Sequence, residues 1–231
     1  VLAEPSLKVV AGIDVKEDDE IWSIPVYHNF EDLPDIDLII DFSSPDGMLQ
    51  ALQCAVSKNA AFVSGTTGLA QEHHDALFNA SEYIPILWSP NMSPGINLLT
   101  KLAEIASTFL PEYDIEVIER HHKNKKDSPS GTAISIVEHI KKMRDLEMNV
   151  VYGRGRGMTK RERNEIGVHS VRGGGILGDH TICLISNDEE IQISHKAISR
   201  QAFSIGAVRA ALWILKQNNG LFRLIDTFNK E

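Results

Sequence analysis

The chain has 231 residues, a formal net charge of −9 and a sequence pI near 5.5. This acidic balance argues against nucleic acid or an anionic membrane surface as the main partner. No apolar run reaches the roughly 18 residues of a membrane span, and a hydrophobic content of 42% suffices for one large domain or two modest ones.

The first part of the chain alternates short apolar runs with helical patterns. Four runs are predicted to form buried strands: residues 7–14, 38–43, 61–64 and 84–88. Between them, Ser44 is a candidate N-cap with Pro45 at the first helical position, and residues 70–82 predict a polar-faced helix. This alternation predicts an α/β fold with a Rossmann-like, doubly wound parallel sheet.

The pattern changes after a longer amphipathic helix at 93–110, whose apolar side is predicted to hold Ile96, Leu99, Leu102, Ala103 and Ala106. A strand at 113–122 and a helix at 130–143 follow. Residues 178–187 and 189–199 alternate in polarity around a turn, which predicts an antiparallel hairpin, and a last helix covers 202–217. We therefore expect three parts: a dinucleotide-binding domain at 1–94, a mixed α+β substrate and oligomerisation domain at 95–203, and a C-terminal helical part at 204–231 that returns to the first domain.

Three further features are read as structural. Cys54 and Cys183 lie in separate apolar runs and are expected to be reduced core residues, which indicates the cytoplasm. His73 and His74 lie on the polar helix and are expected to be solvated. The charged, glycine-rich segment 153–167 is expected to be a mobile surface loop, because its glycines match no phosphate-binding spacing.

Strand ends in the first domain carry the signals of a nucleotide site. Asp14 ends the first predicted strand and fits the acid that binds a ribose, but the glycine turn of a dinucleotide site should lie about 20 residues earlier. We therefore expect the first strand and glycine turn to lie upstream of Val1; the alternative, that Asp14 merely ends a strand, is equally compatible with the spacing. "GTTG" (65–68) and "SPNMSPG" (89–95) follow the third and fourth strands, and together they favour a nucleotide cleft over ordinary turns.

The segment "ERHHKNKKDSPSGTA" (119–133) gathers positive charge directly before a helix start. If the strand continues, His121 and His122 point to opposite faces, and either can donate a proton or hold an anion. Lys125 beside other cations can have a lowered pKa and act as an acid, with Asp127 to orient it. The Ser-Gly-Thr helix start offers backbone N–H groups to a carboxylate or phosphate. These parts suit a small dicarboxylate; a solvated basic loop is the alternative, and a metal site is disfavoured because thiolate or carboxylate ligands are missing.

The same stretch resembles the signature of the dihydrodipicolinate reductase family: Glu, any residue, His-His, three residues ending in Lys, then Asp and Pro-Ser-Gly-Thr-Ala. "IDFSSP", "SVRGGGILGDHT" and "ISHKAISRQAFSIGAVRAALW", together with the two strand-end segments, resemble that family in the same order, so the likeness covers nearly the whole chain. It implies reduction of the cyclic product of pyruvate and aspartate semialdehyde by NADH or NADPH, a step toward diaminopimelate and lysine.

The resemblance also implies roles for individual residues. His121 is similar to the family's general acid/base, and Lys125 to its proton donor. His122, Gly131 and Thr132 are similar to its substrate contacts. The implied cofactor contacts are Asp14, Gly65, Thr66, Thr67, Ser89, Pro90, Asn91 and Met92. Family members are commonly homotetramers that assemble through the sheet of the second domain.

Two departures from the family pattern qualify these expectations. The Gly-x-x-Gly-x-Met turn is absent from the chain as given, and Val15, rather than arginine, follows Asp14. Because an aspartate favours a free 2′-hydroxyl over a 2′-phosphate, a preference for NADH is expected, softened by Lys16. Two other functions stay open at this point: a different two-domain dehydrogenase, against which the His-His and Pro-Ser-Gly-Thr features argue, and a metabolite-binding protein that lacks the cofactor turn.

Overall fold

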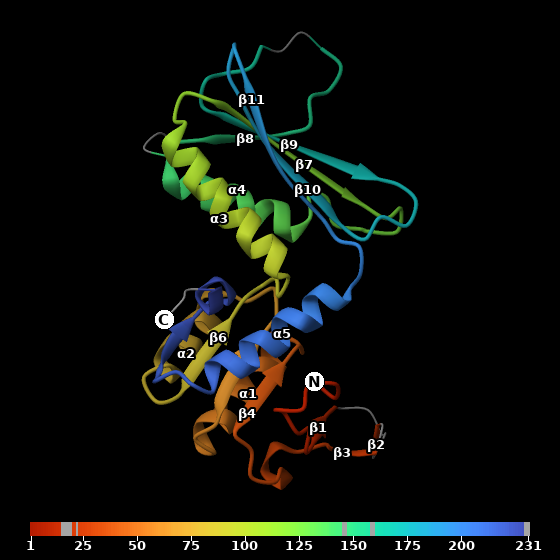
Figure 1. Ribbon diagram of the computed structural model, residues 1–231, viewed down its shortest axis with the longest axis vertical. Helices are drawn as coiled ribbons and strands as arrows, with labels where there is room; N and C mark the ends of the chain where they lie inside the picture. The colour runs from red at the N-terminus through yellow and green to blue at the C-terminus, as the bar shows by residue number, and fades with distance from the viewer. Residues whose placement is uncertain (15–19, 22, 145–146, 158–159, 229–231) are drawn as a thin grey trace. The chain divides into compact units, whose positions relative to one another are not determined.

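A computed structural model describes the chain except for residues 15–19, 22, 145–146, 158–159 and 229–231. The chain folds as two compact units, Val1–Pro94 with Gln201–Glu231, and Gly95–Arg200 (Figure 1). Among the described residues, no helix is long and apolar enough to cross a membrane. Val15 and Lys16, on which the predicted cofactor preference depends, lie outside the described residues.

The first unit is built on a four-stranded parallel sheet in the order β12-β6-β5-β4. Its elements are β4 (Leu38–Asp41), α1 (Pro45–Ser57), β5 (Ala61–Ser64), α2 (Gln71–Ala80), β6 (Pro85–Trp88), α5 (Gln201–Ile214), β12 (Gly220–Phe222) and the 3-10 helices η1 (Phe30–Asp32) and η2 (Leu224–Phe228). Side chains alternate across the sheet. Phe62 and Ile86 pack in one core cluster with residues of α1 and α2, whereas Val63 and Leu87 pack in another with residues of α5. The sheet is therefore covered by helices on both faces, as a doubly wound fold requires.

Local sequence rules explain the helix that follows β4. Ser44 is the N-cap of α1, its side chain accepts a hydrogen bond from the Gly47 N–H at 3.2 Å, and Pro45 opens the helix, as predicted. The prediction that His73 and His74 are solvated is wrong for His73. His73 on α2 is buried rather than solvated, because its Nδ1 accepts a hydrogen bond from the Ala70 N–H and caps the helix start. His74 lies edge-on to the Trp88 ring, with the ring centroids 4.9 Å apart.

The strand predicted at 7–14 is reduced to β1 (Gly12–Ile13). It lies in a separate three-stranded sheet with β3 (Ile24–Tyr27) and β2 (Glu20–Ile21), parallel to β3. The prediction of one buried strand in the main sheet is wrong because a strand needs ladder partners along its length, and β3 pairs only with residues 12 and 13 of this run.

The second unit contains a mixed five-stranded sheet in the order β11-β10-β7-β9-β8. Its elements are α3 (Pro94–Phe109), β7 (Asp114–His121), α4 (Gly131–Met143), β8 (Asn149–Tyr152), β9 (Glu165–Arg172), β10 (Asp179–Ile185) and β11 (Glu190–Lys196). The predicted hairpin is present as β10 and β11, which pair antiparallel. Apolar residues of α3, α4 and one face of the sheet form the core of this unit, and Figure 1 shows both helices on the same side of the sheet. Leu102, predicted to face this core, is instead 38% exposed.

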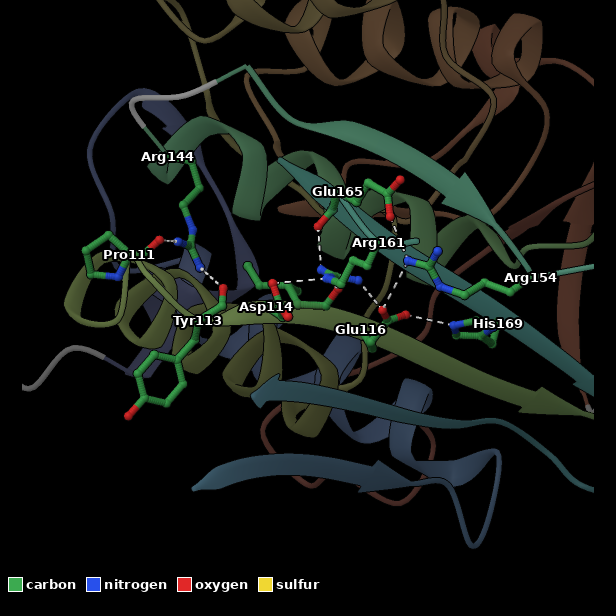
Figure 2. A network of polar contacts seen from close by, with 10 residues as sticks. Pro111, Tyr113, Asp114, Glu116, Arg144, Arg154, Arg161, Glu165 and His169 are labelled. Atoms are coloured by element: carbon green, nitrogen blue, oxygen red, sulfur yellow. Dashed lines mark hydrogen bonds and ion pairs between the residues drawn. The ribbon is translucent and has the colours of Figure 1, made fainter. Parts of the chain in front are cut away.

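A network of ion pairs crosses the other face of this sheet (Figure 2). Glu116 on β7 binds Arg161 and, at 2.7 Å, His169 on β9, and Arg154 binds Glu165 at 2.7 Å. The Arg161 side chain also donates to the Glu165 carbonyl oxygen at 2.7 Å. The prediction that 153–167 is a mobile surface loop therefore needs correction, because Arg154 and Arg161 are bound to the sheet and the last residues of the segment form the start of β9.

Candidate active site

In the first unit, one buried carboxylate organises the carboxyl ends of β4 and β5. Asp41 is 5% exposed and its Oδ2 accepts hydrogen bonds from the Ser64 and Thr66 hydroxyls, both at 2.7 Å. Its Oδ1 accepts from the Ser43 N–H at 3.0 Å. Because Asp41 holds groups on both strands, it fixes the start of the turn after β5.

The turn after β5 carries three of the predicted cofactor contacts. The Gly65 N–H donates to the Asp41 carbonyl oxygen at 2.9 Å, and the Trp88 indole N–H donates to the Thr66 carbonyl oxygen at 3.0 Å. Thr66 is buried, whereas Thr67 is exposed. A Cβ on Gly65 would overlap the ring of Phe42, so glycine permits this close approach. The turn is thus held by its backbone and leaves Thr67 accessible.

The segment after β6 lies next to this turn. The Ser89 N–H donates to the Ser64 carbonyl oxygen at 3.1 Å, and its hydroxyl donates to the Asn91 carbonyl oxygen at 2.8 Å. Met92 is buried, Pro90 is exposed, and Asn91 is partly buried. The structure therefore brings the predicted contacts at 65–67 and 89–92 together at one edge of the parallel sheet, which is where nucleotides bind in such folds.

Asp14, the remaining predicted cofactor contact, lies beside a different sheet from this group. It follows β1 of the small sheet and is exposed, its N–H donates to the Tyr27 carbonyl oxygen at 3.3 Å, and its own carbonyl oxygen contacts His28 Nδ1 at 2.9 Å.

In the second unit, a buried charged cluster surrounds the end of β7. Glu119 is fully buried and accepts two hydrogen bonds from Arg172, at 2.7 and 2.8 Å. His121 Nδ1 lies 2.6 Å from its Oε2, and the Ser130 N–H donates to its Oε1 at 3.1 Å. Burial alone would raise the pKa of Glu119, but hydrogen bonds from Arg172, His121 and Ser170 outweigh it and lower this pKa to about 2. One carboxylate therefore holds both the His121 ring and the start of α4.

A second histidine completes this cluster. His180 on β10 is buried, with its Nε2 3.1 Å from the Ser130 hydroxyl and its ring edge-on to that of His121, 5.3 Å between centroids. Burial, and secondarily the nearby His121, lower the pKa of His180 to about 4. His180 is therefore neutral at pH 7.

The basic segment turns after β7 instead of staying extended. The Lys125 N–H donates to the His122 carbonyl oxygen at 3.1 Å, and the Lys123 N–H donates to the Gly174 carbonyl oxygen at 3.3 Å, so the strand does not continue through the lysines. Lys125 Nζ lies 2.8 Å from Asp127 Oδ1, and the hydrogen bond from Lys125 lowers the pKa of Asp127. The turn thus leaves Lys125 partly buried and oriented by a carboxylate.

The start of α4 closes the same region. Ser130 is the N-cap, and its side chain accepts a hydrogen bond from the Ala133 N–H at 3.2 Å. Gly131 and Thr132 form the first helical turn, where backbone N–H groups face away from the helix and favour anions. His121, Lys125 and the helix start thus belong to one short stretch of chain, fixed at both ends by Glu119.

Sequence reasoning did not assign roles to Glu119, Arg172, His180 or Asp41. The alternation along β7 could have indicated the first, because Glu119 and His121 are two residues apart and therefore share a face. Arg172 and His180 come from other strands and carried no local signal. Among the described residues, no group of three or more His, Cys, Asp and Glu side chains could hold a metal ion.

The residues of the first unit fit a dinucleotide. Small residues at 65–67 and 89–92 follow adjacent parallel strands, and Gly65 allows the backbone to approach closely. Hydroxyl and amide groups in these turns can bind ribose and amide functions.

Comparisons with known proteins agree over nearly the full length. Residues 1–92 match the N-terminal part of dihydrodipicolinate reductase, and residues 95–228 match its C-terminus. Two proteins named 4-hydroxy-tetrahydrodipicolinate reductase, from Rickettsia akari (strain Hartford) and Clostridium novyi (strain NT), are 40% and 39% identical over 228 residues. These alignments cover 96% and 97% of this chain and 91% and 89% of the relatives.

A solved structure has the same fold. Dipicolinate-bound dihydrodipicolinate reductase from Paenisporosarcina sp. TG-14 superposes with a TM-score of 0.81 and 23% identity, and covers 99% of this chain and 92% of that one. Since the identity is low, this likeness concerns the fold, and it agrees with a parallel-sheet unit followed by a mixed-sheet unit.

Proposed function

Because the chain belongs to the dihydrodipicolinate reductase family, we propose that its second unit binds and protonates the substrate through His121, His122, Lys125 and the start of α4. The resemblance seen in the sequence is confirmed: the chain is a 4-hydroxy-tetrahydrodipicolinate reductase, an NAD(P)H-dependent oxidoreductase of the route to diaminopimelate and lysine. The residues that carry each step are proposed from the geometry described above.

The observation that carries this proposal is the double role of Glu119. Its carboxylate binds His121 Nδ1 at 2.6 Å and the Ser130 N–H at 3.1 Å, so the His121 ring and the start of α4 are fixed relative to each other. One carboxylate of the substrate binds the N–H groups of Gly131 and Thr132, where the helix dipole favours negative charge. His122, which follows β7, binds the other.

Proton transfer belongs to the cationic side chains of the same stretch. When bound, reduced nicotinamide supplies a hydride to the substrate ring. Lys125 then donates a proton to the reduced centre, and Asp127 orients the lysine through their 2.8 Å contact. His121 acts as general acid/base beside it.

The cofactor contacts are proposed at Gly65, Thr66 and Thr67 and at Ser89, Pro90, Asn91 and Met92, with Asp14 on the ribose. A carboxylate binds a free 2′-hydroxyl and repels a 2′-phosphate, so we expect NADH to be preferred over NADPH. Comparing kcat/KM for the two cofactors tests this preference. The Asp14→Ser variant should improve use of NADPH, whereas Asp35→Ser, at an exposed carboxylate, should change neither value; a strong NADPH preference in the unaltered protein refutes the proposal.

A homotetramer is proposed for the assembly. In the second unit, α3 and α4 cover one face of the sheet, and no helix among that unit's described residues covers the other (Figure 1). Ile118 and Thr181, on adjacent strands, lie on that open face, a surface through which copies can pair. Sedimentation equilibrium should give four times the chain mass.

The free, buried Cys54 and Cys183 fit a reducing compartment, and we propose the cytoplasm.

A coupled assay tests the function as a whole. Pyruvate and aspartate semialdehyde are supplied together with the synthase that joins them. The absorbance of NADH is then followed with and without this protein. Consumption of NADH that depends on both the synthase and this protein is expected. Consumption that is unchanged when the synthase is left out would mean that another substrate is reduced.

A further inference from the structure

Glu119 is a buried carboxylate whose part in the reaction is not explained by substrate or cofactor contact. It is 0% exposed, lies on β7, and receives four hydrogen bonds within 3.1 Å. A buried charge is costly unless it is paired, so this arrangement requires compensation by its partners. Arg172, on the neighbouring strand β9, supplies the compensating positive charge through a bidentate contact with the Glu119 carboxylate.

The charge state of Glu119 determines which nitrogen of His121 carries hydrogen. The lowered pKa of Glu119 keeps its carboxyl ionised at neutral pH, and an ionised carboxylate only accepts hydrogen bonds. At 2.6 Å from Oε2, His121 Nδ1 must therefore be the donor. This leaves Nε2 as the nitrogen that gains and loses a proton.

A glycine lies against the Nε2 edge of the His121 ring. A Cβ at Gly178 would lie 3.0 Å from Nε2 and 3.5 Å from Cδ2, so a side chain there would press on this edge of the ring. The Gly178 carbonyl oxygen accepts the Ala197 N–H at 2.9 Å, which fixes the backbone at this point. Glycine at 178 thus keeps a side chain away from the proton-exchanging nitrogen.

Arg172 joins the two residues to which proton transfer is assigned. Besides Glu119, its Nη2 donates to the Asp127 carbonyl oxygen at 2.7 Å, and the Asp127 carboxylate holds Lys125. The charged and titratable groups around His121 are Glu119 on its own strand, Arg172 from β9, which binds Glu119, and His180 from β10, which lies edge-on to the His121 ring. Lys125, from the following turn, acts on His180. Arg172 offsets Glu119, Asp127 offsets Lys125, and His180 is neutral.

We propose that Glu119, held by Arg172, is a positioning residue that keeps hydrogen on Nδ1 of His121 and so directs proton exchange to Nε2. This inference rests on the proposed role of His121. During the reaction, His121 takes a proton from the substrate on Nε2 as general base and returns it as general acid, so it begins and ends as the neutral Nδ1–H imidazole. The net proton of the reduction comes from Lys125, and Glu119 stays ionised throughout.

The test begins with the unaltered protein. Nitrogen-15 NMR of histidine-labelled protein, assigned with His121→Ala, should show His121 as the Nδ1–H form when it is neutral. An Nε2–H form in the unaltered protein overturns the inference without any variant.

Glu119→Gln gives the second measurement. The glutamine amide would donate to Nδ1, so the variant should show the opposite, Nε2–H form, and kcat should fall between about tenfold and a thousandfold. Its kcat–pH profile should differ from that of the unaltered protein, and the dissociation constant of NADH should be unchanged. Glu119→Asp, which keeps an accepting carboxylate, should recover part of kcat and the Nδ1–H form; Glu112→Gln, at an exposed carboxylate, is the matched control and should resemble the unaltered protein.

The two possible failures are distinguishable. If His121→Ala keeps normal turnover, the proposed role of His121 is wrong. If His121→Ala abolishes turnover but Glu119→Gln keeps kcat, pH profile and the Nδ1–H form, then only the positioning inference is wrong. Should Glu119→Gln not fold, Gly178→Ala provides the kinetic test: it should lower kcat with the Nδ1–H form retained, and an unchanged kcat contradicts directed exchange at Nε2.

Discussion

Replacing Asp41 by asparagine is expected to loosen the turn that carries the proposed cofactor contacts at 65–67. The Asp41 carboxylate binds the buried Ser64 and Thr66 hydroxyls at 2.7 Å each and the Ser43 N–H at 3.0 Å. The asparagine oxygen will face the two buried hydroxyls, because they have no water to replace their acceptor. Its NH2 group will then face the Ser43 N–H and hydroxyl, which are also donors, so both contacts to Ser43 are lost.

The magnitude follows from these contacts. Hydrogen bonds to a charged group are about twice as strong as neutral ones, so the loss of charge costs about 1 kcal/mol at each of the two hydroxyls. The broken contacts to exposed Ser43 add about 1 kcal/mol, which gives about 3 kcal/mol of stability in all. For a domain of this size the melting temperature should fall by about 6–12 °C.

Thermal unfolding followed by circular dichroism, together with NADH titration by fluorescence, measures both consequences. The dissociation constant of NADH should rise severalfold, because Thr66 is no longer held. Asp35→Asn, at an exposed carboxylate, is the matched control and should leave both values unchanged. An Asp41→Asn protein that melts within about 2 °C of this control and binds NADH equally well would refute the reasoning.

Other substitutions test the packing and charge of both units. Gly206→Ala should destabilise the first unit by about 1–3 kcal/mol in urea unfolding and weaken NADH binding, because the new Cβ would overlap the backbone carbonyl of Met92. The control is Gly155→Ala, whose Cβ meets open space, and equal stability of the two variants would contradict this prediction. Gly167→Ala should lower the stability by a similar amount, since its Cβ would fall on the Glu116 carboxylate that binds Arg161 and His169. This loss of stability should largely disappear when Glu116 is also replaced by alanine, and an equal loss with and without Glu116→Ala would exclude this cause. The folded-state pKa of His180 lies near 4, below its ordinary value of about 6.5, so the folded protein binds fewer protons than the unfolded chain between these values. Stability should therefore fall by up to about 3 kcal/mol as the pH drops from 6.5 to 4, and His180→Gln should reduce this dependence; an unchanged slope in the variant would contradict it.

Features governed by neighbouring residues could be predicted from the sequence. The strand at 61–64 and the N-cap at Ser44 follow from apolar runs and capping chemistry, and the β10–β11 hairpin follows from alternation around a short turn. The reductase family could be identified because its signature is a continuous stretch. Such features depend on interactions within about ten residues.

Features set by distant partners could not be predicted. The run at 7–14 has the composition of a strand, but its length is decided by β3, which pairs with two of its residues. The role of Glu119 depends on Arg172 on another strand, and no local pattern indicates that pairing. His73 was misjudged because a polar helix pattern does not reveal that a ring nitrogen can cap the helix start.

The central claim is that Lys125, oriented by Asp127 beside the start of α4, donates the proton that completes reduction. The most direct test is kcat of Lys125→Ala measured against Lys126→Ala, which removes the neighbouring exposed lysine. We predict that kcat falls about 100-fold or more for Lys125→Ala and stays near normal for Lys126→Ala, with NADH binding unchanged in both. Equal kcat values for the two variants would contradict the account.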